Sequence, residues 1–204
     1  MERKLKLLLL ISGVLLLLVV VMGALSKFGI IKSSTYSKKE FNDNYDKAID
    51  VLNDKMPTDI FWMGKELYWR DELKIKIVDD ISYEALNTDK EYSVLIINDL
   101  DGGVELKDEQ YKVIKNKIDN DDKFGFFYLG TRQKKDLAEY EIIDYSSIRE
   151  EDLCVGNLLF EGERTEWCGI YTIEDRQIAE ENNVKERPVS FIVEFIVRCY
   201  DSNN

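Results

Sequence analysis

The longest hydrophobic run of the chain lies close to its N-terminus. Residues 7–26, LLLLISGVLLLLVVVMGALS, are twenty consecutive uncharged positions that would be apolar on every face of a helix. At a rise of about 1.5 Å per residue, such a helix crosses the roughly 30 Å hydrocarbon core of a bilayer. The pattern predicts a transmembrane helix at 7–26, with a short basic tail at 1–6 before it and a polar linker at 27–36 after it.

A cleaved secretory signal peptide is the alternative interpretation of this run. Its start, MERKLK, is basic, and Ala24 and Ser26 are small residues at the positions that a signal peptidase reads. The run is longer than the usual signal core of about 7–15 residues, which favours an uncleaved anchor. Basic residues flank the run on both sides, so charge alone does not orient it. The short basic tail favours a signal anchor, and therefore a single-pass cell-membrane protein whose C-terminal domain is extracytoplasmic.

From residue 37 onward the hydrophobic pattern is typical of one folded domain, at 37–204. Its first part has helical spacing between the capping-box pattern Ser37-Lys-Lys-Glu40 and Pro57, with apolar residues at Phe41, Tyr45, Ala48 and Leu52. This predicts a helix that ends before the proline. Short apolar or alternating segments at 60–63 and 74–78 predict two strands.

The clearest unit of the domain is a strand, a helix and a second strand. Residues 92–98 contain four adjacent branched apolar side chains, which indicates a strand buried on both faces, as in a parallel sheet. Asp108 and Glu109 then favour a helix start, and Tyr111, Ile114 and Ile118 form its apolar stripe. Residues 123–129 predict the next buried strand. Two parallel strands joined in this way form a crossover unit.

The remaining segments have weaker patterns. Residues 134–140 predict a helix, and residues 141–145, 158–160 and 169–173 predict short strands. The segment after Pro188 alternates like a strand and also has a helical apolar face. A helix is favoured because it would close the domain against the sheet. The predicted fold class is therefore α/β, with a mainly parallel sheet flanked by helices.

Composition narrows the possible chemistry. The chain has 28 basic and 40 acidic side chains, a formal net charge of −12, and no histidine. The acidic balance disfavours binding to nucleic acid, which needs clustered Lys and Arg. The absence of histidine excludes Ser-His-Asp and Cys-His mechanisms. Three cysteines without histidine cannot complete a structural zinc site, so neither a metal nor a cofactor is expected.

Two loops that follow the buried strands are the candidate ligand site, because ligands of open α/β sheets bind beyond the carboxyl ends of the strands. Asp99 and Asp101 could hold a hard cation, and Arg132 could hold a carboxylate or phosphate. Gly102 and Gly103 would permit close approach of a ligand to the backbone. The alternative is an acidic, glycine-bearing turn beside a surface arginine. The position of the bidentate glutamate in an EF-hand calcium loop that starts at Asp99 is occupied by Gln110. The candidate residues are Asp99, Asp101, Gly102, Gly103, Gly130, Thr131 and Arg132.

Cys154 and Cys168 are candidates for a disulfide. In an exported domain, such a bridge would close a loop of moderate length and stabilise the fold by about 3 kcal/mol. The alternative is that both are small buried hydrophobic residues, which is also the interpretation of Cys199.

The central crossover resembles a known family. The stretch Tyr92-Ser-Val-Leu-Ile-Ile-Asn-Asp, followed by Leu106-Lys-Asp-Glu-Gln110 and Phe126-Phe-Tyr-Leu-Gly130, is similar to the central part of class I glutamine amidotransferase-like domains, including the trehalose-utilisation type. The resemblance implies an amidotransferase-like or flavodoxin-like fold. Active members of that family place a nucleophilic cysteine at the turn after the second strand and a histidine further on. Here the turn is Leu129-Gly130-Thr131-Arg132 and the chain has no histidine, so the resemblance implies the fold without the chemistry.

Three functions are compatible with these features. The first is a membrane-anchored, non-catalytic envelope protein whose α/β domain binds a partner or a small ligand. The second is a carboxylate-based enzyme, such as a glycan hydrolase, that works without histidine. The third is an accessory subunit whose helix at 7–26 lies in the lipid bilayer and packs against a membrane-protein partner.

Overall fold

The computed structural model describes residues 38–160 and 163–201. The chain divides into two units, residues 1–42 and 43–204, and only Lys38–Asn42 of the first unit is described. The basic tail at 1–6, the predicted transmembrane helix at 7–26, the linker at 27–36 and Ser37 lie outside the described residues. Among the described helices, none is both long enough and apolar enough to cross a bilayer.

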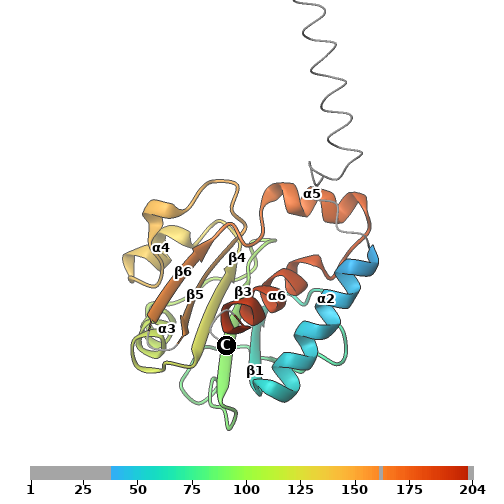
Figure 1. Ribbon diagram of the computed structural model, residues 1–204. Coiled ribbons are helices and arrows are strands. Elements are labelled where there is room, and N and C mark those ends of the chain that lie inside the picture. The colour runs from blue at the N-terminus through green and yellow to red at the C-terminus, as the bar shows by residue number, and fades with distance from the viewer. Residues whose placement is uncertain (1–37, 161–162, 202–204) are drawn as a thin grey trace, which may run out of the picture. The chain divides into compact units, whose positions relative to one another are not determined.

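The second unit is built on a mixed sheet of six strands in the order β2-β1-β3-β4-β5-β6 (Figure 1). The first four strands in this order are parallel, and β5 and β6 continue the sheet antiparallel. Only part of the sheet therefore has the parallel pairing expected from the sequence. The strands are β1 (Thr58–Gly64), β2 (Ile75–Ile77), β3 (Tyr92–Asn98), β4 (Phe124–Leu129), β5 (Cys154–Phe160) and β6 (Glu163–Cys168). The link between β5 and β6 is far too short for a parallel crossover, so these two strands form a hairpin.

Helices cover both faces of the sheet. On one face, α2 (Lys38–Asp50), which continues as the π-helical turn η1 (Val51–Lys55), lies beside α6 (Arg187–Asp201), as Figure 1 shows. On the other face lie α3 (Asp108–Asn120) and α4 (Lys134–Glu139), followed by the 3-10 turn η2 (Tyr145–Ser147). Two hydrophobic cores therefore lie on opposite faces of the sheet, and the strands contribute side chains to both. α5 (Ile173–Glu181) leads into α6.

The strands predicted to be buried on both faces have that burial. Val94 and Ile96 of β3 belong to the core under α2 and α6, whereas Leu95 and Ile97 belong to the core under α3. All six residues of β4 are buried as well. The predicted strands at 92–98 and 123–129 are confirmed, because burial on both faces requires the continuous apolar runs that the sequence contains. The strands predicted at 60–63 and 74–78 are also confirmed, as β1 and the short edge strand β2.

The C-terminal segment is a helix, as favoured from the sequence. Val189, Ile192, Val193 and Ile196 occur at helical spacing and are all fully buried. Pro188 lies in the first turn, where its missing N–H costs no intrahelical hydrogen bond. Packing against the sheet therefore decides between the two periodicities that the segment carries.

Two predicted strands, at 141–145 and at 169–173, are wrong. Glu141 has a φ of 56°, and the N–H of Ile142 donates to the carbonyl of Leu137, so this segment closes α4 instead of extending. In the second case Gly169, with a φ of 74°, breaks the chain away from β6, and α5 begins at Ile173. Both segments bury apolar side chains from a loop, which a sequence pattern does not distinguish from a strand.

The connection from β1 to β2 and the connection from β2 to β3 cross opposite faces of the sheet. Residues 65–74 lead from β1 to β2, and Leu67, Trp69 and Leu73 of this link pack on the core under α2 and α6. Residues 78–91 return from β2 to β3, and Ile81 and Leu86 pack on the opposite core. The strand order therefore reverses between β1 and β3. In open α/β sheets, the carboxyl edge at such a reversal is the usual position of a ligand crevice.

Candidate ligand site

The ends of β1 and β3 are tied together at the point where the strand order reverses. Gly64 lies opposite Asn98 in the sheet and has a φ of 100°, which favours glycine. The side-chain amide of Asn98 donates to the backbone carbonyl of Lys65 (2.7 Å), and its oxygen accepts from the N–H of Leu100 (3.3 Å). These contacts fix the backbone from which Lys65 and Asp101 project.

Lys65 and Asp101 form an ion pair across this edge. The Lys65 ammonium lies 2.7 Å from an Asp101 carboxylate oxygen, and both side chains are more than half exposed. The hydrogen bond and the charge of Lys65 hold the pKa of Asp101 below its ordinary value, and the charge of Arg176 lowers it further. An ion pair this exposed contributes little stability. It can therefore be exchanged for a ligand at small cost.

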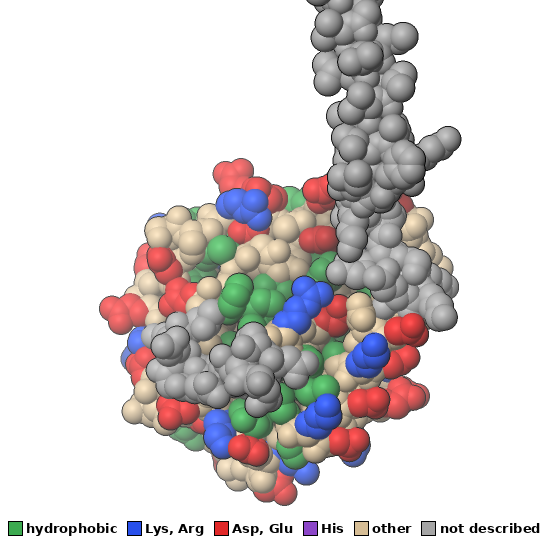
Figure 2. Space-filling model, in the orientation of Figure 1, with side chains coloured by type: hydrophobic (Ala, Val, Ile, Leu, Met, Phe, Trp, Pro, Cys, Tyr) green, Lys and Arg blue, Asp and Glu red, His purple; other side chains and the backbone are tan. Residues whose placement is uncertain are grey.

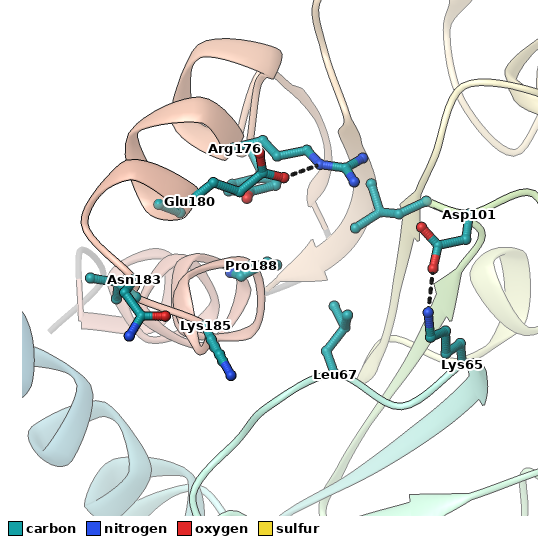
Figure 3. Close-up of a pocket in the computed structure, with 12 residues that line it drawn as sticks. Lys65, Leu67, Asp101, Arg176, Glu180, Asn183, Lys185 and Pro188 are labelled. Carbon is teal, nitrogen blue, oxygen red and sulfur yellow. Dashed lines mark hydrogen bonds and ion pairs between the residues drawn. The ribbon is translucent and has the colours of Figure 1, made fainter.

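One cavity opens beside this pair, between the edge of the sheet and the two C-terminal helices (Figure 3). We call it the α5–α6 cavity; its volume is about 460 Å³, within the range of small-molecule sites. Three basic side chains line it, namely Lys65, Arg176 and Lys185, and two acidic ones, namely Asp101 and Glu180. Its wall is otherwise largely apolar, formed by Leu67, Leu100, Tyr171, Ala179, Val184 and Pro188, with Asn183 beside them.

α5 delivers Arg176 to this cavity through a well-defined start. The hydroxyl of Thr172 accepts from the N–H of Asp175 (3.2 Å), and the Asp175 carboxylate accepts from the N–H of Thr172 (3.0 Å). This capping box satisfies two amides that a helix start would leave without intrahelical partners. Tyr171, directly before it, is fully buried and anchors the chain to the core. The position of Arg176 is thus set by local hydrogen bonds and by packing.

A second cavity lies on the other side of the Lys65–Asp101 pair. We call it the β1–β3 cavity; it has a volume of about 530 Å³ and is lined by both residues of the pair. Asp79 and Glu105 add two more carboxylates to its lining. Its balance of charge is therefore acidic, in contrast to the α5–α6 cavity. Acidic side chains are also spread around the visible face of the domain in Figure 2, so the excess of basic side chains in the α5–α6 cavity is a local feature.

Asp99, a candidate ligand residue, is placed in a buried hydrogen-bond network. One of its carboxylate oxygens accepts from the N–H of Val104 (3.0 Å), and the other accepts from the hydroxyl of Tyr128 (2.7 Å) and the amide of Gln133 (3.3 Å). Burial, together with the hydrogen bond to Asp99, raises the pKa of the Tyr128 hydroxyl far above its ordinary value. Asp99 lines neither cavity, and its oxygens hold the loop after β3 in place.

Gln133 is the centre of this network. Its side-chain oxygen accepts from the N–H of Leu106 (3.0 Å) and the hydroxyl of Tyr111 (2.9 Å), while its amide donates to the carbonyl of Val104 (2.9 Å) and to Asp99. Burial, with the charges of nearby carboxylates, raises the pKa of Tyr111 to about 12. The network joins the loop after β3, the start of α3 and the loop after β4. It was not identified from the sequence, because a glutamine in a loop carries no pattern of its own.

The other candidate residues are divided between these features. The guanidinium of Arg132 donates to the carbonyl of Gly102, so the two predicted loops do meet. Asp101 lines both cavities and Gly103 lines the β1–β3 cavity, whereas Thr131 and Arg132 are exposed outside both. Gly130 has a φ of 153° and packs so closely that an added Cβ would lie 2.8 Å from the Tyr128 hydroxyl.

The other buried carboxylates are held by protein groups. Asp59 accepts from the ammonium of Lys76 (2.5 Å) and the hydroxyl of Thr88 (2.6 Å). Burial raises the pKa of this carboxyl, but these donors together outweigh burial and the net pKa is lowered. Asp152 accepts from the N–H (2.9 Å) and the guanidinium (3.0 Å) of Arg149. In the described part of the chain, no group of three or more carboxylate and thiol residues is arranged to bind a metal.

Lys134 is a buried cation that the sequence analysis did not identify. Its ammonium donates to the backbone carbonyls of Arg149 (3.4 Å) and Asp152. Burial lowers its pKa, against the opposing effect of the nearby Asp152 carboxylate. Since both carbonyls lie in the segment before β5, Lys134 joins that segment to the start of α4.

The structure does not join Cys154 and Cys168, the pair considered for a disulfide; both are free thiols. Cys168 lies opposite Val155 in the β5–β6 hairpin, one position away from Cys154. Because neighbouring residues of a strand point to opposite faces, Cys154 lies in the core under α6 and Cys168 packs on the core under α3. The spacing of the two cysteines in the sequence would suit a disulfide, but the fold places their thiols on opposite faces of the sheet.

The cations of the α5–α6 cavity were also missed from the sequence. Lys65 had the only usable signal, because it follows the strand predicted at 60–63 and carboxyl ends of strands are where ligands bind. Arg176 and Lys185 lie in segments of mixed charge with no motif, and only the packing of α5 and α6 brings them to Lys65.

Comparisons with known proteins add no relative to this picture. No protein-family model, curated protein or solved structure matches the chain.

Proposed function

We propose that this chain is a membrane-anchored, non-catalytic envelope protein whose extracytoplasmic α/β domain binds a small ligand in the α5–α6 cavity. The observation that carries the proposal is the position of this cavity at the carboxyl edge of β1 and β3, where the strand order reverses. The mixture of an apolar wall with a few charged groups is typical of small-molecule sites. The order β2-β1-β3-β4 of the parallel strands is compatible with the flavodoxin-like or amidotransferase-like fold that the resemblance implies.

The chemistry of the described residues supports binding over catalysis. The chain contains no histidine to act as a base near neutral pH. The carboxylates of Asp59, Asp99 and Asp152 are buried, and each accepts hydrogen bonds from protein donors. A buried carboxylate in this state is positioned to hold the fold together, and none of the three lines the α5–α6 cavity. The hydrophobic run at 7–26 supports the membrane anchor, alone or against a membrane-protein partner.

Hydrogen–deuterium exchange of the full-length chain in detergent micelles tests ligand binding. Separate samples receive amino acids, sugars, nucleotides and dicarboxylates. At least one class is expected to slow amide exchange in residues 65–67, 98–104 and 173–188, because a bound ligand stabilises the segments that it contacts. Protection by no class, or protection confined to other segments, would contradict the proposed site.

Protease treatment of intact cells tests the anchor and its orientation. The C-terminal domain is expected to be digested from outside, and the full-length chain is expected to sediment with membranes until detergent is added. A cytoplasmic protein of the same cells serves as the control for cell integrity. Protection of the domain would reverse the orientation, and recovery of the intact chain in the supernatant without detergent would remove the anchor.

A further inference from the structure

We propose that the α5–α6 cavity binds a free α-amino acid with an apolar side chain, in its zwitterionic form. The ligand carboxylate pairs with Arg176, the ligand ammonium pairs with Asp101, and the side chain lies on the apolar wall. This inference rests on the proposed function and names the chemical class of its ligand.

Arg176 is oriented to receive a carboxylate. Its Nε donates to the Glu180 carboxylate (3.0 Å), one turn further along α5. This contact holds the guanidinium so that its outer nitrogens face across the cavity toward Asp101, as Figure 3 shows. Two parallel N–H donors of an arginine match the two oxygens of a carboxylate.

Asp101 supplies the opposite charge. It lines the same cavity as Arg176, whose guanidinium points toward it in Figure 3, and Lys65 is paired with it at 2.7 Å. In an α-amino acid a single carbon separates the ammonium from the carboxylate, so both groups meet their partners at once.

The presence of both signs of charge in the cavity favours a zwitterion. Asp101 and Glu180 line it together with three basic side chains, so a ligand that carries both signs finds an opposite charge for each. A zwitterion offers each sign of charge its opposite and leaves the net charge of the cavity unchanged. It replaces the weak, exposed pair between Lys65 and Asp101.

Lys65 has an alternative position once the ligand ammonium takes Asp101. Its side chain also lines the β1–β3 cavity, where Asp79 and Glu105 provide carboxylates. The displaced ammonium therefore moves from one carboxylate toward others. Lys65 competes with the ligand for Asp101 and does not bind it.

The wall of the cavity selects an apolar side chain. Leu67, Tyr171, Val184 and Pro188 line it, and Tyr171 is fully buried beneath. At its margin Lys185 lies over the ring of Tyr68, with its ammonium 4.7 Å from the ring centroid, so this cation already has an aromatic partner. A charged ligand side chain would lose hydration on this apolar wall.

Isothermal titration calorimetry of the full-length chain in detergent micelles tests the inference with L-phenylalanine and L-leucine. At least one of them is expected to bind. N-acetyl-L-phenylalanine, which lacks the ammonium, and L-phenylalaninamide, which lacks the carboxylate, are each expected to bind about tenfold more weakly or not at all. Equal affinity for the capped analogues would overturn the inference.

Substitutions assign the two partners of the ligand. Arg176→Met is expected to weaken binding about tenfold, whereas Lys65→Met is expected to strengthen it about threefold to fivefold because the competing ammonium is gone. Lys123→Met and Arg198→Met are matched controls. Lys123→Met removes an exposed ion pair with Glu91, Arg198→Met removes an exposed guanidinium that pairs with Glu194, and neither residue lines the cavity. Both controls are expected to leave the affinity unchanged. Weaker binding in Lys65→Met would contradict the proposed competition.

The outcomes separate this inference from the function on which it rests. If neither amino acid binds while another ligand class protects residues 65–67, 98–104 and 173–188 from exchange, the inference is wrong and the proposed function stands. If no ligand class protects these segments, the proposed function fails together with the inference.

Discussion

Replacing Gln133 with leucine is expected to lower the free energy of unfolding by about 4 kcal/mol, because buried polar groups left without partners cost about 1–3 kcal/mol each. The substitution keeps the size of the side chain but removes the partner of the Leu106 N–H, the Tyr111 hydroxyl and the Val104 carbonyl, and one donor to Asp99. The expected loss is smaller than the sum because the Tyr111 hydroxyl can reorient and Asp99 keeps two donors. Urea unfolding of the full-length chain in micelles, followed by tryptophan fluorescence, measures the change.

Two further variants serve as comparisons for Gln133→Leu. Gln177→Leu makes the same replacement at an exposed position of α5 and is expected to change stability by less than about 0.5 kcal/mol. Tyr111→Phe removes one member of the network, and the expected cost is about 1 kcal/mol. A loss in Gln133→Leu no larger than that in Tyr111→Phe would show that the network stabilises the loops far less than its hydrogen bonds indicate.

Replacing Gly64 with alanine is expected to cost about 3 kcal/mol or more, because a strained backbone conformation alone costs about 1–3 kcal/mol. Gly64 has a φ of 100°, and an added Cβ would lie 2.3 Å from the carbonyl oxygen of Asn98 and 2.8 Å from a methyl group of Val104. The first of these neighbours is backbone at the end of β3, where β3 pairs with both β1 and β4, so it cannot move without breaking strand contacts. The same urea titration measures the loss.

Gly103→Ala is the matched control, because an added Cβ at Gly103 would have no neighbour within 4 Å. Its expected effect is within about 0.5 kcal/mol of zero. Gly64→Ala is also expected to weaken ligand binding, since the Asn98 carbonyl that must shift belongs to the strand end that positions Lys65 and Asp101. Equal stability of the two variants would contradict the tight approach of β1 and β3 at this edge.

The sequence was most informative where burial constrains whole segments. The strands at 92–98 and 123–129 contain continuous apolar runs because helices cover both of their faces, and the pattern shows this directly. It was least informative for loops that bury apolar residues, such as 141–145, because a loop has no fixed period. A segment with two periods, such as the one after Pro188, was decided by the surface against which it packs.

The candidate ligand residues Asp99 and Asp101 could likewise be distinguished only by how they pack in the fold. The rule that ligands bind beyond the carboxyl ends of strands led to both Asp99 and Asp101. Only the fold distinguishes them, because one is turned inward to Tyr128 and Gln133 and the other is turned outward to Lys65. Two acidic residues two positions apart in one loop thus have different surroundings that their spacing cannot reveal.

The sequence by itself determined the α/β class, the central strand–helix–strand unit and the absence of histidine chemistry, because each of these depends on local periodicity or on composition. The tertiary structure decided the direction of β5 and β6, the separation of Cys154 from Cys168, and the meeting of Lys65, Asp101 and Arg176. These features depend on contacts between segments far apart in the chain, and such contacts leave no periodic signal in the residues that make them.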